Sequence, residues 1–302
     1  MKKLNSILIF SLVCFLVSGC ISEEIDHGKA NLDISHSITA EVKSFVISKS
    51  VFTEGIEGPA INSKGDLFVV NFKKEGTIGV LRKDSFEFET FIEFSNGSIG
   101  NGIRFDRKDN MFITDYVNHN ILFIENGTKE VEVYCHNDSV NQPNDLALHE
   151  LGFGFASDPN WNKGQGNLIK FSKGKMEIIE KGMGTTNGLA LNPDGNILYV
   201  NESIQTKIWK YNVDSKGGLS NKILFIDMEG FGMDGMRCDL KGNLFLARYG
   251  KGVVSVINKN GDLINEIPLR GEKPTNVTFP FENDNELYIT VQDKKWLEKI
   301  IF

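Results

Sequence analysis

The chain has 302 residues, of which 40% are hydrophobic, so it can bury the core of one large domain or of two small ones. Its formal net charge of −7 argues against a nucleic-acid partner, because phosphate binding needs a basic face. The 30 glycines are spread along the chain, which indicates many tight turns.

Residues 1–19 have the pattern of an export signal. Two lysines precede an apolar run over residues 7–17, which is shorter than the roughly 20 residues of a membrane-spanning helix. Small residues then precede Cys20, and this resembles a lipoprotein signal, in which cleavage leaves the cysteine to carry lipid. We expect an exported protein, lipid-anchored through Cys20 on the periplasmic or extracellular side of a membrane. The alternative is an ordinary secretory signal with an incidental cysteine.

Residues 20–38 are polar and weakly patterned. We expect them to form a flexible tether between the lipid and a folded domain over residues 39–302.

One strand–turn–strand pattern recurs six times in residues 39–302. Each copy has a short strand with an aromatic residue, and these residues recur every 43 to 46 positions: Phe68, Phe112, Phe155, Tyr199, Phe245 and Tyr288. Another apolar strand precedes each aromatic strand, and two alternating segments follow it. Four short strands in roughly 40–50 residues is the size of a propeller blade. The sequence therefore predicts an all-β fold, a six-bladed β-propeller with four-stranded antiparallel blades, and we expect a monomer.

The sixth copy is truncated, since only residues 296–302 follow its aromatic strand as a further strand candidate. Residues 40–47 have strand character and no repeat of their own. We expect this N-terminal strand to complete the last blade, because such closure removes an exposed sheet edge.

Cys135 and Cys238 are the two cysteines that remain in the repeats. They lie in different copies, which favours two buried thiols, although an oxidising compartment would also allow a disulfide.

A polar residue opens the first strand of every repeat. All six are Glu, Asn or Asp, and they recur every 42 to 47 positions: Glu57, Asn101, Asn144, Asn187, Asp234 and Asn276. Because first strands line the channel of a propeller, these side chains should converge at one mouth. The ring suits Ca²⁺, which takes about six to eight oxygen ligands, and Mg²⁺ and Mn²⁺ stay open as alternatives. The competing interpretation is that Asn-Gly and Asp-Gly only form turns.

A second set of polar residues stands at the ends of the second strands, which return to the same mouth. Asp115 and Asp158 are candidates to hydrogen-bond substrate hydroxyls, and Arg248 to bind a carboxylate or phosphate. Together with Asn101 they form the predicted substrate-binding set. The competing interpretation is solvated charge at the blade edges.

The ordered motifs resemble those of the gluconolactonase/regucalcin-like family, which includes calcium-dependent lactonases and phosphotriesterases, over about residues 40–302. The motifs are Glu57-Gly58-Pro59, Pro143-Asn144-Asp145-Leu146, Asn187-Gly188-Leu189-Ala190, Asp234-Gly235-Met236 and Lys273-Pro274-Thr275-Asn276-Val277. The resemblance implies a divalent metal, usually calcium, on Glu57, Asn144, Asn187 and Asp234, with Asp234 as general base or nucleophile. Regucalcin-type members carry Arg where this chain has Gln142, so a preference for sugar acids does not follow.

We therefore predict a metal-dependent hydrolase that opens the lactone of a sugar or related small molecule, with the metal polarising the carbonyl. The alternative is a non-enzymatic propeller that binds a ligand or a protein and holds a structural calcium in its channel. A strictosidine-synthase-like carbon–nitrogen lyase fits the fold but has no support in the ring residues.

Overall fold

The computed structural model describes residues 44–48, 50–281 and 283–302. All of them belong to the unit Ala40–Phe302. The predicted signal, the predicted lipidation site Cys20 and the predicted tether lie outside the described residues. Within the described ranges, no helix has the length and apolar character needed to cross a membrane.

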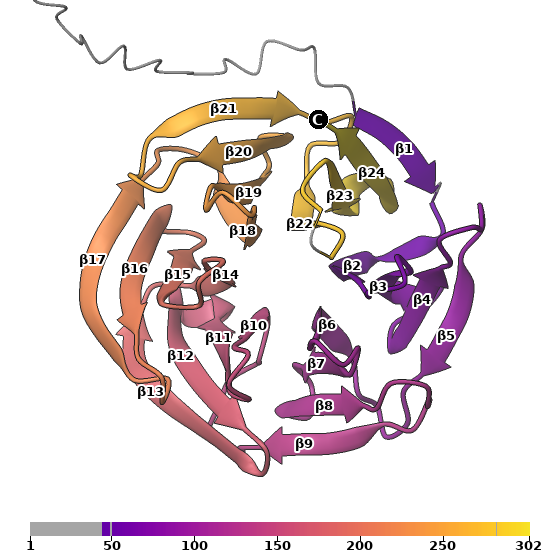
Figure 1. The fold of residues 1–302 in the computed structure, drawn as a ribbon, viewed down its shortest axis with the longest axis horizontal. Coiled ribbons are helices and arrows are strands. Elements are labelled where there is room, and N and C mark those ends of the chain that lie inside the picture. The colour runs from indigo at the N-terminus through magenta and orange to yellow at the C-terminus, as the bar shows by residue number, and fades with distance from the viewer. Residues whose placement is uncertain (1–43, 49, 282) are drawn as a thin grey trace, which may run out of the picture. The chain divides into compact units, whose positions relative to one another are not determined.

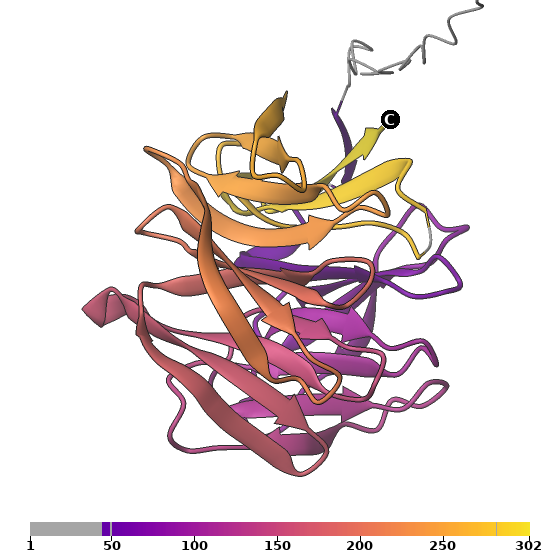
Figure 2. The same cartoon turned by 60° about the vertical axis from the view of Figure 1, so that its left-hand side comes forward.

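Six four-stranded antiparallel sheets stand around a common axis, with the first strand of each sheet nearest to it (Figures 1 and 2). Blade 1 consists of β2 (Phe52–Ile61), β3 (Leu67–Phe72), β4 (Thr77–Leu81) and β5 (Glu89–Glu93). Blade 2 consists of β6 (Gly100–Phe105), β7 (Met111–Asp115), β8 (Asn120–Ile124) and β9 (Glu132–His136). Blade 3 consists of β10 (Leu146–Leu148), β11 (Gly154–Asn160), β12 (Gln165–Ser172) and β13 (Lys175–Met183).

The other three blades repeat this plan, and two short 3₁₀ turns, η1 (Trp161–Lys163) and η2 (Gln292–Lys294), complete the described elements. Blade 4 consists of β14 (Thr186–Leu191), β15 (Ile197–Glu202), β16 (Lys207–Val213) and β17 (Leu219–Asp227). Blade 5 consists of β18 (Gly232–Cys238), β19 (Leu244–Tyr249), β20 (Val253–Ile257) and β21 (Leu263–Pro268). Blade 6 consists of β22 (Pro274–Thr278), β23 (Glu286–Val291), β24 (Trp296–Ile301) and β1 (Ser44–Ser48). The predicted six-bladed propeller is confirmed.

The last blade is closed by the N-terminal strand, as predicted. In the register of β1 and β24, Ser44 faces Ile300 and Val46 faces Glu298. Without β1, the strand β24 would present a free edge of unpaired backbone groups, which invites aggregation. Pairing the two ends of the chain in one sheet therefore also locks the ring.

Apolar side chains fill the space between neighbouring blades, with one buried cluster at each of the six contacts. Between blades 1 and 2, Val70 and Ile78 pack with Ile103 and Ile113. At the closure, Leu297 of blade 6 packs into the first blade's cluster. Burying one such side chain fully contributes roughly 1.5–3 kcal/mol, so each blade is held by both of its neighbours.

The predicted aromatic residues all lie on the second strands, β3, β7, β11, β15, β19 and β23. Cys135 is buried and Cys238 is half-buried, and both thiols are free. Burial raises the pKa of Cys135 to about 12. Both cysteines pack in apolar clusters between blades, which agrees with the prediction that they serve as small buried hydrophobic residues.

Glycines let the inner strands approach each other closely at the axis. A Cβ atom at Gly58 would collide with the carbonyl oxygen of Asn101, and one at Gly188 would collide with that of Asp234. In both cases the obstructing residue belongs to the ring position of the next blade. The Asn-Gly and Asp-Gly pairs are thus not turns but strand positions where neighbouring blades meet.

This close approach predicts that Gly188→Ala destabilises the protein by about 3 kcal/mol, because the clash is with rigid backbone. The matched control is Gly232→Ala in β18, where the nearest heavy atom to an added Cβ is 3.6 Å away. We expect the control to lie within about 1 kcal/mol of the wild type. Urea unfolding followed by fluorescence measures both, and equal stabilities would contradict the prediction.

Candidate functional site

The inner strands bring the ring residues together in one place. Five of the six line a cavity of about 350 Å³: Glu57, Asn101, Asn144, Asn187 and Asp234. The sixth, Asn276, is fully buried beside them and donates from Nδ2 to Glu57 Oε2 at 2.9 Å. The register of the repeat therefore places these six positions at one mouth, as the sequence predicts.

Hydrogen bonds between neighbouring strands orient the ring side chains. Asn187 Nδ2 donates to Asp234 Oδ1 at 2.8 Å, and Asn101 Nδ2 donates to the carbonyl oxygen of Asn144 at 3.3 Å. The nitrogen of the Asn187 amide is thereby occupied, while its oxygen remains for another partner.

Two amide oxygens of the ring are buried without a hydrogen-bond partner among the described residues. They are Asn144 Oδ1 and Asn187 Oδ1. Leaving a buried polar atom unpaired costs about 1–3 kcal/mol, so two such oxygens on one cavity suit a ligand that interacts with both. With the carboxylates of Glu57 and Asp234 they form a set of hard oxygen donors that fits a divalent cation.

A metal held by this set would need amide oxygens as well as carboxylates. In the part of the chain that the structure describes, no group of three or more His, Cys, Asp or Glu side chains could hold a metal. A hard cation at this cavity would therefore need the oxygens of Asn144 and Asn187 in addition to Glu57 and Asp234. Such neutral amide ligands are ordinary partners of Ca²⁺.

Burial and mutual repulsion act against the ionised forms of the two ring carboxylates. Burial, and then the negative charge of Asp145, raise the pKa of Glu57 to about 7. Burial, and then the charge of Glu57, raise the pKa of Asp234 well above its ordinary value. A bound cation would offset both effects, because an opposite charge favours the ionised carboxylates.

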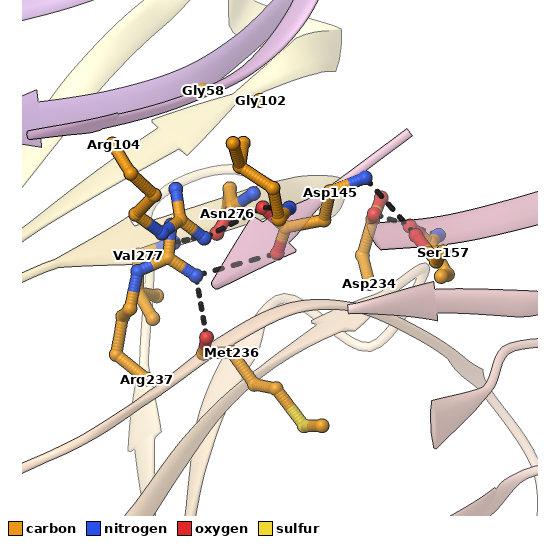
Figure 3. A network of polar contacts seen from close by, with 12 residues as sticks. Gly58, Gly102, Arg104, Asp145, Ser157, Asp234, Met236, Arg237, Asn276 and Val277 are labelled. Atoms are coloured by element: carbon orange, nitrogen blue, oxygen red, sulfur yellow. Dashed lines mark hydrogen bonds and ion pairs between the residues drawn. The ribbon is translucent and has the colours of Figure 1, made fainter. Parts of the chain in front are cut away.

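Two arginines and an aspartate form a buried ion cluster further along the inner strands, and Figure 3 shows both guanidinium groups directed at Asp145. Arg104 Nη2 lies 2.6 Å from Asp145 Oδ1, and Arg237 Nη1 lies 3.3 Å from Asp145 Oδ2. The arginine side chains are 13% exposed and that of Asp145 is 1% exposed. Burial, together with the charge of Arg237, lowers the pKa of Arg104 to about 9, so it still carries its charge at neutral pH.

Side chains from blades 3, 5 and 6 complete the walls of the cavity. Trp161 of η1 comes from blade 3, Tyr249 from the end of β19, and Gln292 from η2. Tyr249 donates from its hydroxyl to Gln292 Oε1 at 2.5 Å, and Gln292 Nε2 donates to the carbonyl oxygen of Glu54 at 2.8 Å. Two aromatic rings thus border the cavity, one of them held by a bridge between blades 5, 6 and 1. No lysine or arginine of the described residues lines it.

Three residues of the predicted substrate-binding set lie outside this cavity. Asp115 and Asp158 have no exposed surface, and Arg248 is 1% exposed. Asp115 accepts from Ser98 Oγ at 2.8 Å, and Arg248 donates to the carbonyl oxygen of Phe231 at 3.1 Å.

The three residues have the same structural role, which is to hold a loop through hydrogen bonds. Asp158 accepts from the backbone N–H groups of Asn141 and Gln142, each at 2.7 Å. Each of the three thus anchors the loop that leads into the first strand of its own blade. They were expected to bind substrate at the mouth, and the structure instead buries them outside the cavity that the ring lines, because the loops need buried partners for their backbone groups. Of the predicted set, Asn101 alone lies on the cavity wall.

The sequence interpretation missed the ion cluster. Arg104 and Arg237 each stand three residues after a ring position, and Asp145 occupies the place that glycine takes after most other ring residues. Extending the repeat register by three residues would have singled out these two arginines. Nothing in the register would have shown that one carboxylate serves both.

Comparison with known families identifies most of the propeller. The model of the SMP-30/Gluconolactonase/LRE-like region matches residues 56–293. A gluconolactonase of Zymomonas mobilis is 28% identical over 175 residues, which cover 50% of this chain and 49% of the relative. A pentonolactonase of Haloferax volcanii is 27% identical over 157 residues, which cover 51% of this chain and 54% of the relative. The chain thus spans about half the length of these two curated relatives.

Solved structures share the fold. A calcium-binding regucalcin of Agrobacterium tumefaciens superposes with a TM-score of 0.75 at 19% identity, covering 86% of this chain and 93% of that one. A gluconolactonase of Xanthomonas campestris superposes with a TM-score of 0.72 at 20% identity, covering 86% and 89%. At these identities the superpositions establish the architecture alone.

The repulsion between ring carboxylates predicts that Asp234→Asn stabilises the metal-free protein. Because the folded state raises the pKa of Asp234, this carboxyl destabilises the protein at pH values above the ordinary pKa of an aspartate, and asparagine removes that effect. At neutral pH we expect a gain of about 1 kcal/mol or more in the free energy of unfolding. Denaturant unfolding in excess chelator measures it. Asp227→Asn, at an exposed position of β17, is the control and should change stability by less than about 0.5 kcal/mol. A loss of stability in Asp234→Asn would contradict the prediction.

Proposed function

This chain belongs to the SMP-30/gluconolactonase/LRE-like family, and we propose that it hydrolyses the lactone of a sugar or a related small molecule at the cavity of Glu57, Asn144, Asn187 and Asp234. The observation that carries the proposal is a pair of amide oxygens with no hydrogen-bond partner among the described residues, beside the buried carboxylate of Glu57 and the half-buried carboxylate of Asp234 in that cavity. Lactonase relatives of the same family support the reaction type.

The residues around Asp234 suit it to act on a carbonyl carbon, as general base toward water or as nucleophile. Asn187 fixes one of its carboxylate oxygens through the 2.8 Å hydrogen bond. In the overall reaction the oxygen of water bonds to the acyl carbon, the ring C–O bond breaks, and the ring oxygen takes up a proton. The product is a hydroxy acid, which releases a proton at neutral pH.

A divalent cation, which we expect to be calcium, would be held by Glu57, Asn144, Asn187 and Asp234, and when bound would polarise the lactone carbonyl. Because such a positive charge favours ionised carboxylates, Asp234 would carry its charge at neutral pH in spite of its burial.

The walls define how a lactone ring would lie. Trp161 and Tyr249 offer aromatic faces to the apolar C–H face of a ring, while Asn101 offers a polar group to hydroxyls. A cavity of about 350 Å³ is at the small end of ligand sites, which suits a single ring.

The proposal predicts calcium-dependent release of protons from a panel of sugar lactones. In a pH-indicator assay, chelator and the variant Asp234→Asn should each lower kcat by about 100-fold or more, because both remove groups that act on the reacting atoms. Asp227→Asn serves again as control and should keep wild-type rates. Hydrolysis that persists at the wild-type rate after chelation, or in Asp234→Asn, would overturn the mechanism. Calcium binding without hydrolysis of any lactone would instead favour a binding propeller.

The aromatic wall predicts a separate effect on substrate binding. Trp161→Ala should raise KM by about tenfold and leave kcat within about threefold, because the side chain touches the ring and not the reacting carbonyl. Leu240→Ala, at a position 58% exposed and outside the cavity, is the control. A selective loss of kcat in Trp161→Ala would show that this residue does more than hold the ring.

A further inference from the structure

The buried cluster of Arg104, Asp145 and Arg237 has no part in the proposed reaction. Burying a charge costs several kcal/mol, and replacing a buried ion pair with apolar side chains of similar size is often neutral or stabilising. Three charges buried beside the axis are therefore not explained by a contribution to stability alone. Their position points to an electrostatic role toward the cavity.

The cluster is not neutral in itself. Asp145 supplies one negative charge to two guanidinium groups, so one positive charge is left over. Arg237 Nη2 is buried and has no hydrogen-bond partner among the described residues. The excess positive charge is therefore balanced within the protein only by groups farther away.

The nearest balancing groups belong to the ring. Arg104 stands three residues after Asn101 on β6, and Arg237 stands three residues after Asp234 on β18, which is about 10 Å along an extended strand. Figure 3 draws Asp234 and the cluster in one network of polar contacts. Burial acts most strongly on the pKa of Glu57, and the positive charge of Arg237 acts on it in the opposite direction. The cluster and the ring thus form one buried set of charges.

We propose that Arg104 and Arg237 act as an internal counter-charge to the ring, which holds the carboxylates of Glu57 and Asp234 together in the metal-free protein and weakens the binding of a divalent cation. The inference rests on the cation site of the proposed function. Asp145 has the opposite effect, since it screens the two arginines from the ring. Cation affinity is then set by a balance of charges and not by the ring oxygens alone.

The test uses calcium chloride alone as the probe, with no substrate, and measures the dissociation constant by calorimetry on the full protein. Arg104→Met and Arg237→Met should each bind calcium about tenfold more tightly, and Asp145→Asn about tenfold more weakly, because a charge buried near the site acts through a low dielectric. Arg237→Lys keeps the charge and should stay within about threefold of the wild type. Arg82→Met, which removes a half-exposed surface arginine, should leave the affinity unchanged.

The opposite effects expected for the arginine and aspartate substitutions distinguish this role from a structural one. If the cluster only supports the fold, Arg104→Met, Arg237→Met and Asp145→Asn should all weaken calcium binding, and that result would overturn the inference. The same holds if Arg237→Lys behaves like Arg237→Met. A second readout is the melting temperature, which in Arg237→Met should fall more in chelator than in saturating calcium, while equal falls would speak for a structural role.

The outcomes also separate this inference from the proposed function. A wild type that binds no calcium defeats the cation site and the inference together. A wild type that binds calcium and hydrolyses lactones, with all cluster variants shifted in the same direction, defeats the inference and leaves the function standing.

Discussion

Two carboxylates, Glu57 and Asp234, share one small cavity, and the other features of the site can be understood from the repulsion between them. Asn187 and Asn276 each donate a hydrogen bond to one of these carboxylates. The arginines of the ion cluster add positive charge nearby. Each of these contacts reduces the free-energy cost of burying like charges, and a divalent cation would reduce it further.

The close approach of the inner strands makes this arrangement possible. Glycines at positions 58 and 188 have no Cβ atoms that would keep neighbouring blades apart. The backbone of the ring residue in the next blade, Asn101 or Asp234, can therefore approach closely. The clusters between blades and the pairing of β1 with β24 then fix the distance of every inner strand from the axis. The precision of the site is therefore a property of the closed ring and not of any one blade.

Similar acidic residues in this fold serve different purposes according to depth. Asp234 faces the cavity, while Asp115 and Asp158 are fully buried and accept hydrogen bonds from the loops that enter the inner strands. Each blade of a propeller has both positions, one on its first strand and one at the end of its second strand. A polar residue near the mouth can therefore either contact a ligand or hold a loop. The proposed function uses residues of the first kind, and those of the second kind hold the loops that lead into the inner strands.

The sequence by itself determined the number of blades, the strand that closes the ring, and the register that brings Glu57, Asn144, Asn187 and Asp234 to one cavity. It could do so because these features follow from a repeat period and from the alternation of strands, which are local patterns. Only the tertiary structure decided that Arg248, Asp115 and Asp158 are buried and do not line the cavity, and that Arg104 and Arg237 meet at Asp145. These depend on which side chain of one blade lies opposite which side chain of another, over separations of up to 92 residues between Asp145 and Arg237. No local pattern records such pairings, because they arise only once six blades have closed around a common axis.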